Sequence, residues 1–162
     1  MKYMGLLLMV FFLPLSCSTQ QDCCAQVAGN DTLFEFSLVN ENQEDLFDGV
    51  TQNSYDPKTI KLYNLIDGKE TLIHNPNSDS PNGYLIFERD ELHRIRPFFD
   101  ESNLTSKGIV EWSPTNRDTL SLTMVQQSER VKRLVMIKYN GETVWDETVS
   151  TNINDRYFQI VK

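Results

Sequence analysis

Short runs of alternating hydrophobic and polar residues extend from position 32 to the end of the chain. Phe34, Phe36 and Leu38 alternate with polar residues, and the same two-residue period recurs over 120–124. Successive side chains of a strand point to opposite faces, so this period predicts strands with one buried face. No long run has a helical period. The predicted strands cover 32–39, 58–66, 69–75, 83–88, 92–99, 107–112, 118–126, 130–139, 142–150 and 157–162.

Asp67-Gly68 separates two of these runs by two residues. Such a pair supplies the two positive-φ positions of a type I′ turn, which predicts a tight β-hairpin. A two-residue loop also sets the register of the strands that it joins. We therefore expect Tyr63 opposite Leu72 and Leu62 opposite Ile73.

Asn140-Gly141 predicts a second hairpin of the same kind. The turn places Met136 opposite Trp145 and Ile137 opposite Val144. Both faces of this hairpin carry apolar residues, which predicts a strand pair inside the structure. By contrast, 74–82 contains two prolines and several turn-forming residues, and it is expected to be a long loop.

About ten short strands with turn signals between them, and no helical pattern, favour an all-β fold. We predict an antiparallel two-sheet β-sandwich of immunoglobulin-like type, with a small closed barrel as the alternative. The 162 residues fit a single domain, which we place at 31–162.

The N-terminal segment has the pattern of a signal peptide. Lys2 precedes an apolar run from Gly5 to Leu15, and polar residues follow at once. The run is shorter than the roughly 20 apolar residues that span a membrane. We expect 1–16 to be a signal peptide and 17–30 to be a flexible leader.

Leu13-Pro14-Leu15-Ser16-Cys17 resembles the lipobox of bacterial lipoproteins. The resemblance implies that Cys17 is acylated and tethers the domain to the outer membrane. Residues 18–21 are uncharged, whereas surface-exported lipoproteins of Bacteroides-type bacteria tend to have an acidic run there. A periplasm-facing position and a surface position therefore both stay open.

The chain has three cysteines, at positions 17, 23 and 24. The predicted domain therefore has no internal disulfide, although its expected compartment is oxidising. Cys23-Cys24 is either a pair of incidental leader thiols or a redox-active pair, since a bond between neighbours is strained. Adjacent thiolates lack the spacing of a zinc site.

The net charge excludes two classes of partner. It is −8 for the whole chain, and Lys2 is the one charged residue within 1–16. The remainder therefore carries −9, which is unsuited to binding nucleic acid or an anionic membrane surface through charge.

No catalytic motif is present, and the two histidines have no partner at metal-site spacing. His74 is expected at a strand end, and His93 shares a face with Glu91 and Ile95. The sequence predicts no enzyme, no cofactor and no metal site. EF-hand patterns begun at Asn40 or Asn75 fail at their sixth and twelfth positions, and a looser calcium site between loops stays open.

Two aromatic residues are candidates for stacking on a sugar ring. Trp112 alternates with a polar residue and is expected in the core, whereas Trp145 shares its face with Thr143 and is expected to be partly covered. If Trp145 and Tyr63 were exposed on one sheet face, their rings would suit a glycan.

Arg94 and Arg96 point to one side of a predicted strand. They are candidates for binding an acidic ligand, although pairing with carboxylates of the chain is the simpler expectation. Thr32 and Thr119 stand in Asp-Thr-Leu triplets that resemble the O-glycosylation sites of Bacteroides-type bacteria.

As a whole, the chain resembles the small lipoproteins common in Bacteroides-type bacteria. The resemblance is carried by the signal and Cys17, by Glu44-Asp45-Leu46-Phe47 followed by Ile60-Lys61-Leu62-Tyr63, and by 140–145. It implies no particular reaction. We expect a lipid-anchored envelope protein that acts as a binding or assembly module, with an envelope protein or a glycan as partner. An accessory carbohydrate-binding domain and a hydrolase without a recognisable motif are the alternatives.

Overall fold

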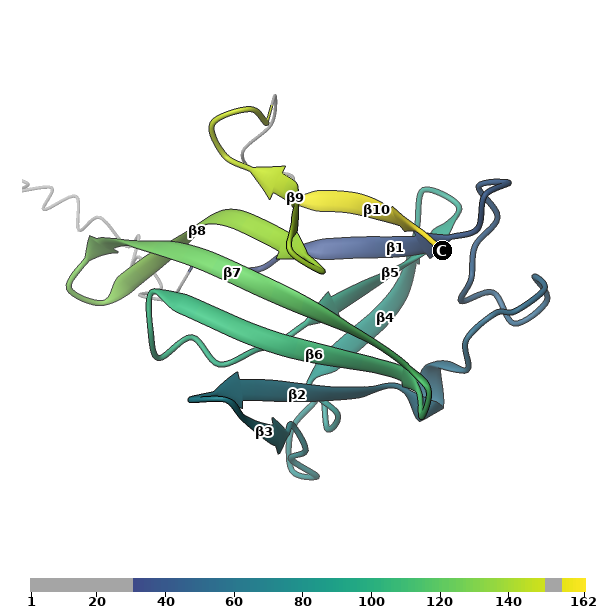
Figure 1. The fold of residues 1–162 in the computed structure, drawn as a ribbon, viewed down its shortest axis with the longest axis horizontal. Helices are drawn as coiled ribbons and strands as arrows, with labels where there is room; N and C mark the ends of the chain where they lie inside the picture. Colours follow the sequence, from purple (N-terminus) through teal and green to yellow (C-terminus); the bar gives the residue numbers. More distant parts are fainter. Residues whose placement is uncertain (1–30, 151–155) are drawn as a thin grey trace, which may run out of the picture.

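The computed structural model describes residues 31–150 and 156–162, which form ten β-strands and one short 3₁₀-helix, η1 (Figure 1). The predicted signal peptide and leader, with Cys17, Cys23 and Cys24, lie outside the described residues. The elements are β1 (Glu35–Val39), η1 (Pro57–Thr59), β2 (Lys61–Ile66), β3 (Lys69–Leu72), β4 (Tyr84–Arg89), β5 (Leu92–Pro97), β6 (Thr105–Ser113), β7 (Asn116–Ser128), β8 (Val131–Tyr139), β9 (Glu142–Asp146) and β10 (Tyr157–Val161).

The strands form two sheets, which confirms the predicted β-sandwich. One sheet has the order β10-β1-β5-β4, and the other has the order β3-β2-β6-β7-β8-β9. The described strands do not close into a barrel. All pairs are antiparallel except β1 and β10, the first and last strands, which run parallel. The predicted antiparallel arrangement is confirmed for the other described strand pairs. The β1–β10 pair departs from it, because alternation along a strand carries no information about its partner's direction.

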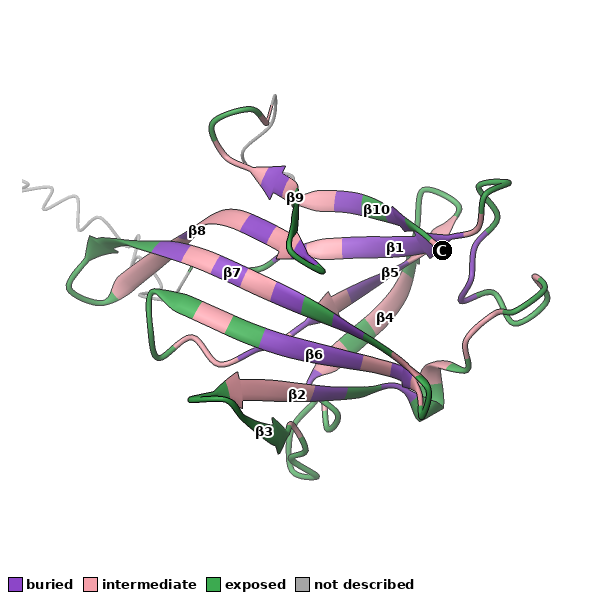
Figure 2. Cartoon of the chain, in the orientation of Figure 1, coloured by how far each residue is buried: buried purple, intermediate pink, exposed green. Residues whose placement is uncertain are grey.

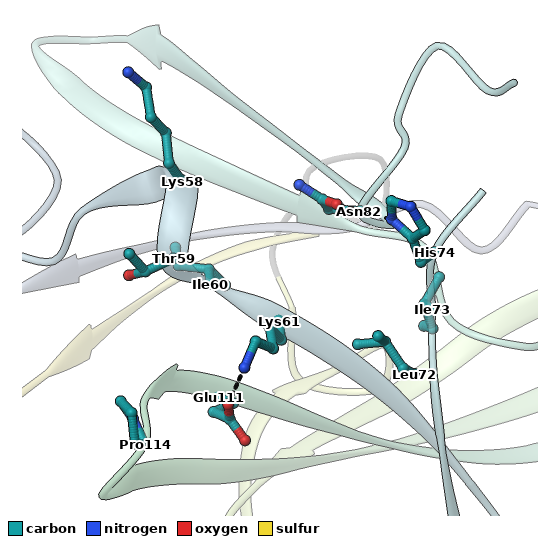
Figure 3. A pocket seen from close by; sticks show the side chains of 10 residues that line it. All are labelled: Lys58, Thr59, Ile60, Lys61, Leu72, Ile73, His74, Asn82, Glu111 and Pro114. Atoms are coloured by element: carbon teal, nitrogen blue, oxygen red, sulfur yellow. Dashed lines mark hydrogen bonds and ion pairs between the residues drawn. The ribbon is translucent and has the colours of Figure 1, made fainter. Parts of the chain in front are cut away.

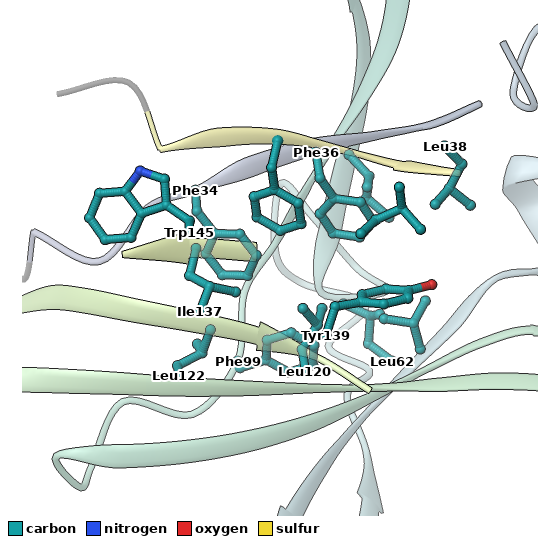
Figure 4. Close-up of a cluster of buried hydrophobic side chains, with 14 of the residues drawn as sticks. Phe34, Phe36, Leu38, Leu62, Phe99, Leu120, Leu122, Ile137, Tyr139 and Trp145 are labelled. Carbon is teal, nitrogen blue, oxygen red and sulfur yellow. The ribbon is translucent and has the colours of Figure 1, made fainter. Parts of the chain in front are cut away.

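The core lies between the two sheets and is rich in aromatic rings. Phe36 contacts Trp112 edge to face and stacks on Phe158, with ring centres 6.2 and 5.3 Å apart. Trp112 belongs to the six-stranded sheet, whereas Phe36 and Phe158 belong to the four-stranded one. Leu120 and Ile137 of the six-stranded sheet also lie in this core, and both are fully buried (Figure 4). The alternation predicted for 34–38 and 120–124 is thus confirmed, because its apolar residues are the ones between the sheets.

The strands differ strongly in burial. β1 is buried along nearly all its length, whereas every residue of the edge strand β3 is exposed (Figure 2). Residues 73–83 join β3 to β4 as an extended loop, as predicted. Among the described residues, no helix has the length and apolarity needed to cross a membrane.

The Asp67-Gly68 hairpin has the predicted register. Tyr63 pairs with Leu72, and the N–H of Ile73 donates to the Leu62 carbonyl oxygen at 2.8 Å. The strand expected over 58–66 is shorter than predicted, because η1 occupies its beginning. The Asp56 carboxylate accepts from the Lys58 N–H at 2.9 Å and caps η1, so the chain turns before β2 begins.

The Asn140-Gly141 hairpin forms, but its predicted register is wrong beyond the turn. Lys138 pairs with Thr143, whereas Ile137 pairs with Trp145, which leaves Val144 as the extra residue of a β-bulge. The bulge turns the Trp145 ring inward. Moreover, β9 is the edge of its sheet rather than an interior strand, since β8 has neighbours on both sides and β9 does not.

The chain before β1 bridges the two sheets. Asp31 pairs with Arg133 of β8, through hydrogen bonds of its N–H to Lys132 and of its carbonyl to Leu134. The strand predicted over 32–39 therefore begins only at Glu35, because the preceding residues cross from the six-stranded to the four-stranded sheet.

Candidate functional site

An open pocket of about 470 Å³ lies at the β2–β3 edge of the six-stranded sheet (Figure 3). We call it the edge pocket. Its walls come from η1 and the start of β2, from the end of β3 with the following loop, and from the end of β6. The lining residues are Lys58, Thr59, Ile60, Lys61, Leu72, Ile73, His74, Asn82, Glu111 and Pro114.

Polar groups stand on opposite sides of the edge pocket. On one side, the Lys61 ammonium donates to the Glu111 carboxylate at 3.0 Å, and the Tyr63 hydroxyl lies 3.4 Å from its other oxygen. On the other side, His74 Nδ1 lies 3.3 Å from the Asn82 side-chain oxygen. Both groups of donors and acceptors reach solvent, so a ligand can contact either of them.

The apolar surface of the edge pocket comes from two kinds of residue. Ile60 belongs to the core and is 2% exposed, whereas Leu72 on the free edge strand is 50% exposed. Ile73 packs against the core from the pocket side. An apolar floor with polar groups at its rim suits a ligand that is part apolar and part polar.

The structure does not bring Trp145 and Tyr63 together. Trp145 is 6% exposed, in the core, with the Arg156 guanidinium 5.6 Å above its ring (Figure 4). Tyr63 lies on the outer face of β2, half-buried, with the Arg117 guanidinium 5.1 Å above its ring. The expected partial exposure of Trp145 is not observed, because the bulge at Val144 directs its ring between the sheets.

Arg94 and Arg96 do lie together, on the outer face of the four-stranded sheet. Arg94 Nη1 donates to Glu35 Oε2 at 3.2 Å, and Arg96 donates to the other oxygen of the same carboxylate. Burial raises the pKa of Glu35, but the hydrogen bonds from Arg96 and Arg94 outweigh it and lower the pKa below its ordinary value. The expected pairing with carboxylates of the chain is thus present.

The two candidate glycosylation threonines differ in access. The Thr32 side chain is buried and its hydroxyl donates to Glu101, so an enzyme cannot reach it without local opening. Thr119 is exposed on the outer face of β7, and its N–H donates to the Asn140 side-chain oxygen at 2.8 Å. Only Thr119 is accessible in the fold.

The histidines lie in different surroundings. His74 lines the edge pocket. His93 Nδ1 lies 2.8 Å from Asp45, and the same carboxylate oxygen accepts the His93 backbone N–H at 2.7 Å. Within residues 31–150 and 156–162, no three His, Cys, Asp or Glu side chains group closely enough to hold a metal ion.

Carboxylates gather around one broad depression beside His93, which bears on the hydrolase alternative. Asp45 and Asp48 line it together with Glu44, Glu88 and Glu91. Asp45 is fixed by N–H groups of Phe47 and His93. The pKa of Asp48 is lowered, chiefly by the Thr51 N–H, so Asp48 does not hold the proton that a general acid needs.

The structure also contains a buried carboxylate that the sequence reasoning missed. Asp118 accepts hydrogen bonds from Trp112 Nε1 and the Tyr139 hydroxyl, both at 2.5 Å, and from Asn140 Nδ2 at 2.7 Å. The Lys162 ammonium completes its shell. A signal was present in the sequence, because Asp118 is in phase with Leu120 and thus falls on the buried face of its strand.

Burial raises the pKa of Asp118, but its donors outweigh burial and hold the pKa below its ordinary value. Burial and the Asp118 charge together raise the pKa of Tyr139, so its hydroxyl stays protonated as a donor. Both oxygens of the Asp118 carboxylate are thus engaged by groups of the chain. We therefore assign Asp118 a structural role.

Comparisons with protein-family models, with curated proteins and with solved structures found no match to this chain. The chain is a small all-β protein with two sheets.

Proposed function

We propose that the protein is a lipid-anchored module of the bacterial cell envelope that binds a partner at the edge pocket. The anchor is proposed on the resemblance of residues 13–17 to a lipobox. The single observation that supports binding is the pocket itself, where half-exposed Leu72 lies among polar groups at a free sheet edge.

Binding accounts for the edge pocket better than catalysis does. Glu111 contacts the Lys61 ammonium at 3.0 Å and the Arg117 guanidinium at 3.4 Å, so its oxygens are engaged by cations of the chain and are less available to accept a proton from a substrate. His74 has Asn82 as its neighbour and no described nucleophile beside it. Exposed backbone at the β3 edge offers hydrogen bonds to an extended peptide of a partner protein.

Palmitate labelling in the producing cell tests the anchor. The wild-type chain is expected to take up label and the Cys17→Ala variant is expected to take up none, because the acyl group needs the Cys17 thiol. Cys23→Ala and Cys24→Ala are the matched controls and are expected to keep the label. Label that persists on Cys17→Ala would overturn the anchor and leave the pocket untouched.

Site-specific photocrosslinking in intact cells tests the pocket. A photoreactive residue at position 72 is expected to capture a partner. The same residue at position 125 is the control, since Val125 is also apolar and 38% exposed but lies on β7 away from the pocket. His74→Ala, which alters the pocket without changing Leu72, is expected to reduce capture. Equal capture at both positions contradicts the proposal.

An accessory carbohydrate-binding role is the second proposal. Trp145 is buried and cannot contact a glycan, so this proposal is based on the edge pocket. Tyr63 lies next to this pocket and shares the Glu111 carboxylate with it. A glycan array separates the two proposals: glycan binding that is lost in Tyr63→Ala and Glu111→Gln favours carbohydrate, whereas an array without binding favours a protein partner.

A further inference from the structure

Another cavity, of about 260 Å³, lies where β1 begins, at the four-stranded sheet. The edge pocket belongs to the other sheet. Three arginines from different parts of the chain line it: Arg89 at the end of β4, Arg96 on β5, and Arg156 just before β10. Asp31, Leu33 and Glu35 contribute from the segment that leads into β1. We call this the arginine cavity.

The arginine cavity concentrates positive charge in an acidic protein. Glu35 is surrounded by three guanidinium groups, those of Arg94 and Arg96 in direct contact and that of Arg89 at 4.0 Å. Its one carboxylate cannot neutralise all three. The surplus stands out in a chain whose net charge is −8.

Arg156 adds a further guanidinium, which pairs with Asp31 within the described part of the chain. Both of its terminal nitrogens donate to Asp31, at 2.7 and 2.8 Å. Arg94 also pairs with Asp90, at 2.6 Å. Among residues 31–150 and 156–162, the four arginines are therefore paired with three carboxylates, Asp31, Glu35 and Asp90, which leaves one positive charge.

The hydrogen-bonding capacity of these arginines is also not used up. Of the arginines that line the cavity, Arg96 and Arg156 have buried Nε atoms without a hydrogen-bond partner among the described residues. The side chain of Arg156 is 10% exposed, so water does not replace a partner there. Buried donors are normally paired, and unpaired ones suggest a missing acceptor.

Arg89 is placed to close on such an acceptor. Its side chain is 59% exposed, and its two ion pairs are long, at 4.0 Å to Glu35 and 3.8 Å to Asp90. Long exposed ion pairs contribute little stability, so Arg89 can turn toward a ligand at small cost. Leu33, which is 50% exposed, provides an apolar contact at the rim.

We propose that the arginine cavity binds the oxyanion group of a small organic acid, a carboxylate or a phosphate, with the apolar part of the ligand against Leu33. Guanidinium groups match both oxyanions in geometry and charge. This site is separate from the edge pocket and goes beyond the function proposed above.

Isothermal titration of the purified full-length chain in detergent, at constant ionic strength, tests the proposal with inorganic phosphate and with hexanoate. We expect saturable binding of at least one probe. Arg96→Gln is expected to weaken it at least tenfold and Arg89→Gln about threefold. Arg117→Gln is the control, because Arg117 pairs with Glu70 on the other sheet. This variant should bind the probes with the same affinity as the wild type.

Arg89→Gln keeps the test decisive if Arg96→Gln fails to fold, since Arg89 is exposed and only loosely paired. Leu33→Ala is expected to lower the affinity for hexanoate and to leave the affinity for phosphate unchanged. The absence of saturable binding to both probes overturns the proposal, as does equal weakening by Arg89→Gln and Arg117→Gln. Phosphatidylglycerol vesicles that bind in competition with phosphate would identify a lipid headgroup as the source of the oxyanion, and vesicles that do not compete would identify a free acid.

Discussion

Asp118 and Glu35 are both largely buried carboxylates surrounded by donors, and the donors differ in kind. Asp118 accepts from an indole, a phenol and an amide, and one cation, Lys162, balances its charge. Glu35 is surrounded by guanidinium groups alone.

The difference shows that the partners of a buried carboxylate can either balance its charge or leave an excess of positive charge beside it. Neutral donors fill the shell of Asp118 without adding charge, so the group is complete within the chain. Arginines fill the shell of Glu35 with more charge than it can balance, and the surplus faces a cavity. Asp118 therefore stabilises the fold, whereas Glu35 positions arginine side chains at the surface.

Asp118→Asn should have the largest effect. It removes the charge that pairs with Lys162 and replaces one acceptor oxygen by a donor, so that buried partners such as Tyr139 lose their acceptor. We expect a loss of about 3 kcal/mol or more in the free energy of unfolding, measured by urea denaturation. Asp79→Asn, in the exposed loop, is the control and should change it by less than about 0.5 kcal/mol. A loss as small as that of the control would show that the network contributes nothing.

Glu35→Gln should have a smaller effect on stability and a positive one on binding. We expect a loss of about 1–2 kcal/mol, because the side chain keeps one acceptor and the arginines can turn toward solvent. The same change removes a competing negative charge from the arginine cavity, so oxyanion affinity should rise. Titration with phosphate measures this rise. An unchanged or weaker affinity would contradict the claim that the arginines around Glu35 carry excess positive charge that faces the cavity.

Acid should weaken the fold through both carboxylates. Their pKa values are lower in the folded protein than their ordinary values of 3.8 for Asp118 and 4.5 for Glu35. A depressed folded pKa contributes stability above the ordinary value, and that stability is lost as the pH falls through the folded pKa. The urea midpoint should therefore fall from pH 5 to pH 3, and fall less in Asp118→Asn. Equal falls in wild type and variant would mean that Asp118 does not contribute.

Glu70→Gln should have the smallest effect. Glu70 pairs with Arg117 at 2.6 Å across the surface, and both side chains are more than one-third exposed. Exposed ion pairs contribute little, so we expect less than about 0.5 kcal/mol in urea denaturation. A larger loss of unfolding free energy would show that this surface ion pair contributes as much to stability as Asp118 or Glu35 does.

Local patterns predicted much of this fold, and non-local features escaped prediction. Alternation located all ten strands, and the Asp67-Gly68 turn set a correct register, because both depend on neighbouring residues. The bulge at Val144 and the parallel pairing of β1 with β10 depend on distant packing. A register slip of one residue was enough to move Trp145 from a surface candidate to the core.

The candidate sites also combine features that depend on neighbouring residues, which the sequence predicted, with features that depend on distant residues, which it did not. The common face of Arg94 and Arg96 followed from alternation, but Arg156 and Glu35 join them only through the strand order of the sheet. The edge pocket draws on three separate segments, and no spacing in the sequence connects Leu72 with Glu111. Asp118 was predictable in principle, since an acid in phase with Leu120 marks a buried charge.

The pairing of the first strand with the last has a consequence for when the protein can fold. β10 lies beside β1, and Lys162, which directly follows β10, donates its N–H to Val39 and its ammonium to Asp118. The four-stranded sheet and the Asp118 network are therefore completed only after residues 157–162 have been synthesised. Until then the chain lacks its last edge and a counter-charge for its buried acid. Strand β1 therefore waits, while the intervening strands are synthesised, for a partner strand that comes last among the described elements.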